Sequence, residues 1–402
     1  MRAMSNLIAV QKVLVAVIAL EGAALVVGGC SSSDDAPVSE PDGGSLDEAS
    51  VADASTPEVA PDAMDSGKRT CSDQNFCHTT LPSAQATLRG VWGDGTVVWS
   101  VSEEGEVLRW DGSAWSVHAS KLGALYTIWG SGPTDIWIGG ERGLHHGTGA
   151  TSQAVVFEPV ASPGDEEIPI RSIWGTSATD VWAVGGEPDM MMEGAGRARV
   201  LQLDGGGSSW SLSSVSSEPF AFNHVWADAE GGIWIAGDDG SGYSQSNAVL
   251  RRAPGASDFV EVTVSAYNEE DGPVSGAPGT VTGGGLGGDG RIVLSGRTRS
   301  GTPSFWSGAP GGDGEIEWSY EARDLNDPNL HSVWALDGAT TWVAGDYGRL
   351  RSWDGTKWMQ AAIMIADFPV IAPLHAIWGT KADDFWVVGR NIALHRKPKE
   401  AP

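Results

Sequence analysis

Few positive charges and few cysteines distinguish this 402-residue sequence, which has 25 Lys and Arg against 52 Asp and Glu, and only 3 Cys. The formal net charge of −27 repels nucleic acid and anionic lipid headgroups, so we expect no nucleic-acid partner. The H-E-x-x-H, G-x-S-x-G and Walker lysine motifs are also missing. The sequence therefore identifies no catalytic residues, and we expect no metal and no cofactor.

Apolar runs are short as well, and none approaches the roughly 20 residues that a membrane-spanning helix needs. The runs near the N-terminus, Val13–Leu20 and Ala23–Val27, are followed by "VVGGC", which ends at Cys30. This arrangement resembles a bacterial lipobox, so we predict a lipoprotein signal peptide over residues 1–29 and lipidation of Cys30. A transmembrane anchor is the alternative, and the length of the runs disfavours it.

The segment after Cys30 differs in composition from the rest of the chain. Residues 31–70 contain ten acidic residues, clusters of serine, alanine and proline, and no aromatic residue. Such a segment buries too little apolar surface to fold. We predict that residues 30–70 form a disordered acidic tether, which holds a folded domain over residues 71–397 away from the membrane.

Cys71 and Cys77 are the other two cysteines. In an exported protein a disulfide between them is the expected state. The alternative is a metal site that includes His78, but zinc sites usually have four ligands and more closely spaced cysteines.

A tryptophan hairpin recurs through the folded part, and "IRSIWGTSATDVWAVGG" (Ile170–Gly186) is a clear copy. Each copy has two short β-branched and aromatic runs joined by a polar turn, which predicts an antiparallel pair of strands, here a and b. The chain has 55 Gly and 21 Pro, as many tight turns require. The first motif positions of the seven units are Trp92, Trp129, Trp174, Trp226, Gly285, Trp334 and Trp378. The second positions are Trp99, Trp137, Trp182, Trp234, Val293, Trp342 and Trp386.

Two further strands, c and d, follow where the units are well preserved, as in Glu106–Val117 and Arg349–Gln360 with their Asp-Gly turns. Seven units of four strands predict an all-β, seven-bladed β-propeller of four-stranded antiparallel blades. The last unit lacks room for a fourth strand. We expect Asn75–Ser83 to complete it as an N-terminal closing strand, with the Cys71–Cys77 bridge holding it in place.

The side chains that recur from unit to unit have a structural explanation. Twelve of the 19 tryptophans stand at motif positions, so packing between blades is a better explanation for them than stacking on sugars. Asp135, Asp180 and Asp384 stand two places before the second tryptophan, and we expect them to accept backbone N–H bonds in the a-to-b turn.

The pattern W-G-T-x-x-x-D-V-W-A-V-G resembles that of secreted and lipid-anchored bacterial proteins whose tandem repeats are taken to form β-propellers. The resemblance covers residues 88–390, and it implies the fold and an envelope location. A weaker resemblance links "SWDGTKW" (Ser352–Trp358) to the Asp-boxes of sialidases, which are structural turns. Neither resemblance implies an activity, because propellers serve many functions.

One position of the repeat suggests a binding site. Three residues before the first motif position, all seven units have a polar or amphipathic residue. These residues are Arg89, Tyr126, Arg171, Asn223, Thr282, His331 and His375. Because the position begins the innermost strand, we predict a ring at one mouth of the central channel, where arginine and histidine would bind an anion or a glycan carboxylate. The alternative is that strand starts are simply solvated.

Long insertions fall in the b-to-c and d-to-a connections, for example Glu187–Arg199, Asp238–Asn247 and Ser265–Gly279. In a propeller these connections share one face, so we expect the ligand there, with Met190–Met192 as an apolar contact. The prediction is a monomeric lipoprotein of the bacterial cell envelope, on a periplasmic or surface face, for example of the outer membrane. Its propeller binds or scaffolds a protein or glycan, and only the lipid anchor contacts the membrane. The alternative is a glycan-directed hydrolase or lyase with its site in the channel.

Overall fold

The computed structural model describes residues 70–188, 196–238, 247–264, 276–311 and 315–398. The predicted signal peptide and Cys30, together with nearly all of the tether, lie outside the described residues, as do Met190–Met192. Within the described part, no helix is both long and apolar enough to cross a membrane.

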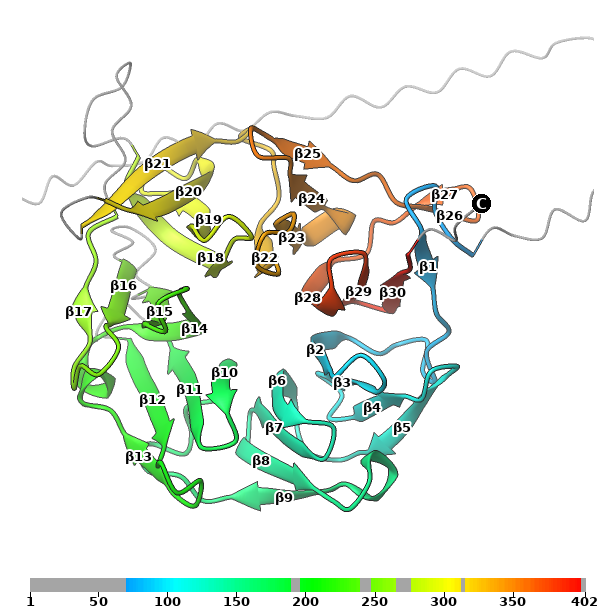
Figure 1. Ribbon diagram of the computed structural model, residues 1–402, viewed down its shortest axis with the longest axis horizontal. Helices are drawn as coiled ribbons and strands as arrows, with labels where there is room; N and C mark the ends of the chain where they lie inside the picture. Colours follow the sequence, from blue (N-terminus) through cyan, green and yellow to red (C-terminus); the bar gives the residue numbers. More distant parts are fainter. Residues whose placement is uncertain (1–69, 189–195, 239–246, 265–275, 312–314, 399–402) are drawn as a thin grey trace, which may run out of the picture. The chain divides into compact units, whose positions relative to one another are not determined.

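Seven four-stranded antiparallel sheets form the fold and confirm the predicted propeller (Figure 1). Blade 1 contains β2 (Leu88–Gly93), β3 (Val98–Ser102), β4 (Val107–Trp110) and β5 (Trp115–Ala119). Blade 2 contains β6 (Leu125–Gly132), β7 (Asp135–Gly140), β8 (Gly143–Thr148) and β9 (Val156–Val160). Blade 3 contains β10 (Ser172–Ser177), β11 (Asp180–Glu187), β12 (Arg197–Leu203) and β13 (Trp210–Leu212). Blade 4 contains β14 (Ala221–Ala227), β15 (Ile233–Asp238), β16 (Asn247–Arg252) and β17 (Val260–Glu261).

The remaining blades continue in the same order. Blade 5 contains β18 (Pro278–Leu286), β19 (Ile292–Thr298), β20 (Pro303–Pro310) and β21 (Ile316–Ala322). Blade 6 contains β22 (Leu330–Trp334), β23 (Trp342–Gly345), β24 (Leu350–Trp353) and β25 (Trp358–Gln360). Blade 7 contains β28 (Leu374–Lys381), β29 (Asp384–Gly389), β30 (Ile392–Arg396) and β1 (Phe76–His78). Outside the blades are the short hairpin β26 (Met364–Ile365) and β27 (Phe368–Pro369), and the 3₁₀ turns η1 (Ser152–Ala154), η2 (Ser214–Ser217) and η3 (Asp346–Gly348).

The closing strand lies where the sequence predicts it. β1 pairs antiparallel with β30, with Phe76 opposite Arg396 and Cys77 opposite His395. A disulfide joins Cys71 to Cys77. The N-terminal end of the folded part therefore completes the last blade and covers the open edge of β30.

The motif tryptophans are cross-strand partners in the a-to-b hairpin of every blade that has them. The pairs are Trp92–Trp99, Trp129–Trp137, Trp174–Trp182, Trp226–Trp234, Trp334–Trp342 and Trp378–Trp386. In blade 5 the same register pairs Gly285 with Val293, which confirms that the fifth unit follows the repeat without its two tryptophans. The second tryptophan of each pair is almost fully buried, so the motif forms the packing between blades as expected.

The aspartates before the second tryptophan have side-chain partners, which corrects the expectation of backbone bonds. Asp384 accepts a hydrogen bond from His395 Nε2 at 2.7 Å, and Asp135 accepts one from His146 in the same way. Asp180 accepts the Thr176 hydroxyl at 2.5 Å. In blades 2 and 7 the aspartate thus fixes a histidine on strand c, and that histidine stacks on the second tryptophan.

Candidate functional site

All seven predicted ring residues line one cavity of about 940 Å³ in the centre of the propeller. The structure therefore brings together side chains from all seven blades that are up to 286 residues apart, from Arg89 to His375. A cavity of this size, lined by apolar walls and a few polar groups, has the character of a ligand-binding site.

Local backbone geometry explains why this position faces the channel. Six of the ring residues are the unpaired residue of a β-bulge between strands a and b, where the register shifts by one residue. They are Arg89, Tyr126, Asn223, Thr282, His331 and His375. A bulge leaves one residue out of the strand ladder and redirects its side chain, and bulges are common beside functional sites. The ring position is therefore a repeated structural feature of the blades.

Blade 3 reaches the same position by another route. Arg171 directly precedes β10, and its backbone N–H donates to the Val184 carbonyl oxygen at 2.8 Å. Its guanidinium lies 4.3 Å from the centre of the Tyr126 ring, a cation–π contact that orients it across the boundary between blades 2 and 3. Arg171 has no carboxylate partner in the described part of the chain.

Arg89 is already paired. Its Nε donates to Glu103 Oε1 at 2.8 Å, and Glu103 lines the same cavity. The two side chains are about equally exposed, at 36% and 35%, so water competes for the pair and a ligand carboxylate has access to it. Of the two arginines, Arg171 is thus the more available cation.

The two ring histidines are neighbours, with centroids 6.2 Å apart. His331 Nε2 donates to Asp346 Oδ1 at 3.0 Å, and His375 Nδ1 donates to the Leu88 carbonyl oxygen at 2.9 Å. Burial, followed by the nearby positive charge of Arg89, lowers the pKa of His375 below its usual value. His375 is therefore neutral at pH 7, and it is a hydrogen-bonding group of the ring more than a cation.

A third histidine of the cavity, His224, is not found by the repeat analysis. It follows Asn223 and lies on the other side of the same bulge. Burial, with a smaller effect of His331, lowers the pKa of His224 to about 4, so this residue also stays neutral at pH 7. The spacing of the motif gave no signal for it, because the neighbouring position is apolar or small in several units.

Apolar side chains also line the channel. The position directly before the first motif tryptophan is β-branched in six blades and glycine in the fifth, and all seven residues line the cavity. They are Val91, Ile128, Ile173, Val225, Gly284, Val333 and Ile377. A ligand in the channel thus meets both the polar ring and this apolar collar.

The face assignment has support from the connections that the structure describes. Pro188 and Asp238, at the start of two b-to-c connections, line the cavity together with the ring. The middle parts of the long insertions lie outside the described residues.

The enzymatic alternative requires carboxylates and arginines at hydrogen-bonding distance in the channel. The Arg89–Glu103 pair meets this requirement in part. A single ion pair is equally suited to ligand binding, so the geometry does not select catalysis over binding. Across the described ranges, no group of three or more His, Cys, Asp or Glu residues is arranged to hold a metal ion.

The chain matches no protein-family model, and no curated protein is significantly similar to it. Solved structures are similar in fold. YCF48 bound to D1 peptide has a TM-score of 0.56 and 16% identity, with 83% of this chain and 100% of that chain covered. Virginiamycin B lyase from Staphylococcus aureus has a TM-score of 0.56 and 11% identity, with 80% and 98% covered. The WD40 β-propeller domain of Doa1 has a TM-score of 0.53 and 13% identity, with 81% and 98% covered.

Identities this low establish the fold alone. The protein is a seven-bladed β-propeller, rich in tryptophan and built from repeats. This fold is consistent with a binding or scaffolding module.

Proposed function

We propose that this protein is a lipid-anchored receptor of the bacterial cell envelope whose propeller binds a carboxylate-bearing protein segment or glycan at the channel mouth. The observation that carries the proposal is the convergence of the seven ring residues on one cavity of about 940 Å³. Because acidic residues are in excess over the whole chain, an anion is repelled from most of the protein, and the two arginines of the ring offer it a local positive charge.

The channel suggests how the ligand is held. Its carboxylate would pair with Arg171, which is oriented by Tyr126, and would compete with Glu103 for Arg89. Neutral His375, beside Arg89, and the Thr282 hydroxyl of blade 5, which donates to the Leu330 carbonyl oxygen at 2.6 Å, supply further hydrogen-bonding groups. The apolar collar would contact the uncharged part of the ligand.

A protein ligand has support from one similar fold, since the YCF48 structure is of a propeller bound to a peptide. A glycan ligand has support from the arginines of the ring, because the carboxylate of an acidic sugar would bind them as a peptide carboxylate does. Both sources provide the same carboxylate, so binding assays have to separate them.

The anchor belongs to the same proposal. Lipid on Cys30 and the tether over residues 30–70 would keep the propeller close to the membrane, where envelope proteins and glycans are concentrated. Strand β1 completes the propeller within a single chain, which fits a monomer.

The test uses acidic peptide and acidic glycan arrays, followed by calorimetric titration of the strongest ligand. The double variant Arg89→Ala, Arg171→Ala should weaken binding by about tenfold to a hundredfold, because each charge-assisted hydrogen bond contributes about 1.5 to 3 kcal/mol and Arg89 is partly compensated. Arg142→Ala, Lys357→Ala is the matched control, since it removes the same charge from two exposed sites outside the cavity.

Equal loss of affinity in both double variants would show that binding depends on net charge and would overturn the ring as the site. Mass spectrometry of each ligand after incubation addresses catalysis. Cleavage that depends on Glu103 would favour the hydrolase or lyase alternative over a receptor.

A further inference from the structure

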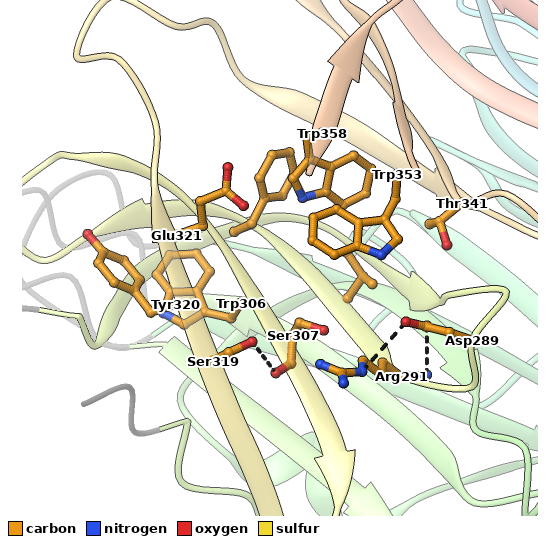
Figure 2. A pocket seen from close by; sticks show the side chains of 12 residues that line it. Asp289, Arg291, Trp306, Ser307, Ser319, Tyr320, Glu321, Thr341, Trp353 and Trp358 are labelled. Atoms are coloured by element: carbon orange, nitrogen blue, oxygen red, sulfur yellow. Dashed lines mark hydrogen bonds and ion pairs between the residues drawn. The ribbon is translucent and has the colours of Figure 1, made fainter. Parts of the chain in front are cut away.

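Blade 5 lacks the second motif tryptophan, and a second cavity lies at this position. Val293 takes the place of the tryptophan and lines a pocket of about 290 Å³ between blades 5 and 6 (Figure 2). At the equivalent junction of blades 7 and 1, where Trp386 is present, the pocket is smaller, at about 210 Å³.

Blades 2 and 7 show one way in which this space is filled. In blade 7 the ring of Trp386 stacks on His395 at 4.2 Å, and Asp384 binds that histidine. In blade 2, Trp137 stacks on His146 at 4.0 Å, with the equivalent aspartate behind it. At these two junctions the space is thus occupied by an indole, an imidazole and a carboxylate.

Blade 5 has a different residue at each of the three positions. Val293 replaces the tryptophan, Ser307 replaces the histidine that pairs with it, and Arg291 replaces the aspartate two places earlier. All three line the pocket. The two aromatic rings are missing, and the charge at the end of the space is reversed.

The neighbouring blade still has the side chains that would clamp an aromatic ring. The c-to-d hairpin of blade 1, "WDGSAW", places Trp110 and Trp115 each 5.1 Å from Trp386. The matching hairpin of blade 6, "WDGTKW", places Trp353 and Trp358 on the wall of the pocket. The same aromatic clamp is therefore present, and the indole it holds elsewhere is absent.

Aromatic and polar groups define the size and ends of the pocket. Trp358 stacks on Phe305 with centroids 4.5 Å apart, which fixes one wall. Strand register places Arg291 two residues before Val293 and Glu321 opposite Phe305, so the two charged groups lie at different ends (Figure 2). Arg291 Nε is 3.5 Å from Asp289 Oδ2, and the side chain is 48% exposed, which leaves it accessible. Burial raises the pKa of Glu321 above its usual value.

We propose that this pocket is a second binding site, for a small molecule or terminal side chain that carries a planar aromatic ring and a carboxylate. The ring takes the place of the missing tryptophan between Val293 and the Trp353–Trp358 hairpin. The carboxylate pairs with Arg291, at the position where blades 2, 3 and 7 have an aspartate. Glu321 accepts a ring N–H at the far end.

Titration calorimetry of the purified full chain with indole-3-acetate, indole and acetate tests the site. Indole-3-acetate should bind more tightly than indole, and acetate alone should not bind measurably. Arg291→Gln should weaken binding of indole-3-acetate about threefold to tenfold and leave indole unchanged, because the arginine is partly exposed to solvent.

Val293→Trp provides the stronger test, since it fills the pocket with the side chain that six other blades have at this position. It should abolish binding of both indole compounds and raise the melting temperature by about 2 °C or more. Ser307→His is a second, smaller filling that should also block binding. Met359→Trp is the control, because it adds a tryptophan at an exposed position of β25.

Three results would overturn the proposal. The first is wild-type protein that does not bind indole-3-acetate at millimolar concentration. The second is Val293→Trp or Ser307→His protein that is folded and still binds with wild-type affinity. The third is binding of methyl glucuronide in place of indole-3-acetate, which would show that the pocket takes a saturated ring.

Discussion

Closure of the propeller by β1 leads to a prediction about Phe76. This side chain is fully buried in blade 7, and its ring lies 5.9 Å from Trp342 of blade 6 and 5.8 Å from Phe385. Replacing it by alanine removes these edge-to-face contacts and leaves a cavity. Buried Phe→Ala substitutions reduce the free energy of unfolding by about 3 to 5 kcal/mol, and the same loss is expected here.

Guanidinium unfolding, followed by tryptophan fluorescence, measures the change. Because β1 joins the two ends of the folded domain, Phe76→Ala should lower the stability of the whole propeller and not of one blade alone. Phe368→Ala is the control, since this phenylalanine is 75% exposed and its loss should change stability by less than about 0.5 kcal/mol.

The disulfide acts on the same strand. It closes a short loop with a sequence separation of 6, and its removal by Cys71→Ser, Cys77→Ser should cost roughly 2 kcal/mol. Deleting residues 31–68 should have almost no effect. If Phe76→Ala is no more destabilising than Phe368→Ala, or if deleting residues 31–68 lowers stability as much as Phe76→Ala does, closure by β1 does not stabilise the propeller.

Two further predictions concern the channel and the anchor. His224 has a pKa of about 4 in the folded protein and about 6.5 when unfolded, so the unfolded state binds more protons between these values and stability should fall as the pH decreases through this window. In urea unfolding, His224→Gln should reduce the loss of stability between pH 7.5 and 4.5 by about 2 kcal/mol. If the variant has the pH dependence of the wild type, the imidazole of His224 is not protected from protonation. Cys30→Ser should abolish labelling by a fatty-acid analogue and move the protein into the aqueous phase of a detergent extraction. A wild-type protein that is equally water-soluble would contradict the anchor.

Much of the fold follows from the sequence because each blade repeats the same packing problem. The paired tryptophans mark the strands, and the missing last strand identifies β1. The sequence also predicted the seven ring positions, but for an incomplete reason. What turns Arg89 and His375 into the channel is a β-bulge, and nothing in a strand-like run of residues indicates which one leaves the ladder.

The errors concern charge and partners. The expectation that histidine binds an anion as a cation does not account for burial, which lowers the pKa of His375. The role of Asp135 and Asp384 was also missed, although a signal existed. In both units a histidine follows the aspartate by 11 residues, a regularity that strand c explains. This regularity is present in the complete units and not in the a-to-b hairpins alone.

Departures from a repeat are informative when the repeat itself is core packing. A buried tryptophan that contacts the next blade contributes several kcal/mol, so a unit that loses it needs some other occupant of the space or must tolerate a cavity. Blade 5 has neither the motif tryptophan nor the histidine and aspartate of blades 2 and 7, while blade 6 keeps both tryptophans that face this space. Loss of packing alone does not explain why blade 5 has an arginine at a position where no other unit has a basic residue. A ligand whose anionic group faces Arg291 and whose ring takes the place of the tryptophan explains both changes, and for this reason the pocket of blade 5 and the channel mouth are separate sites to test.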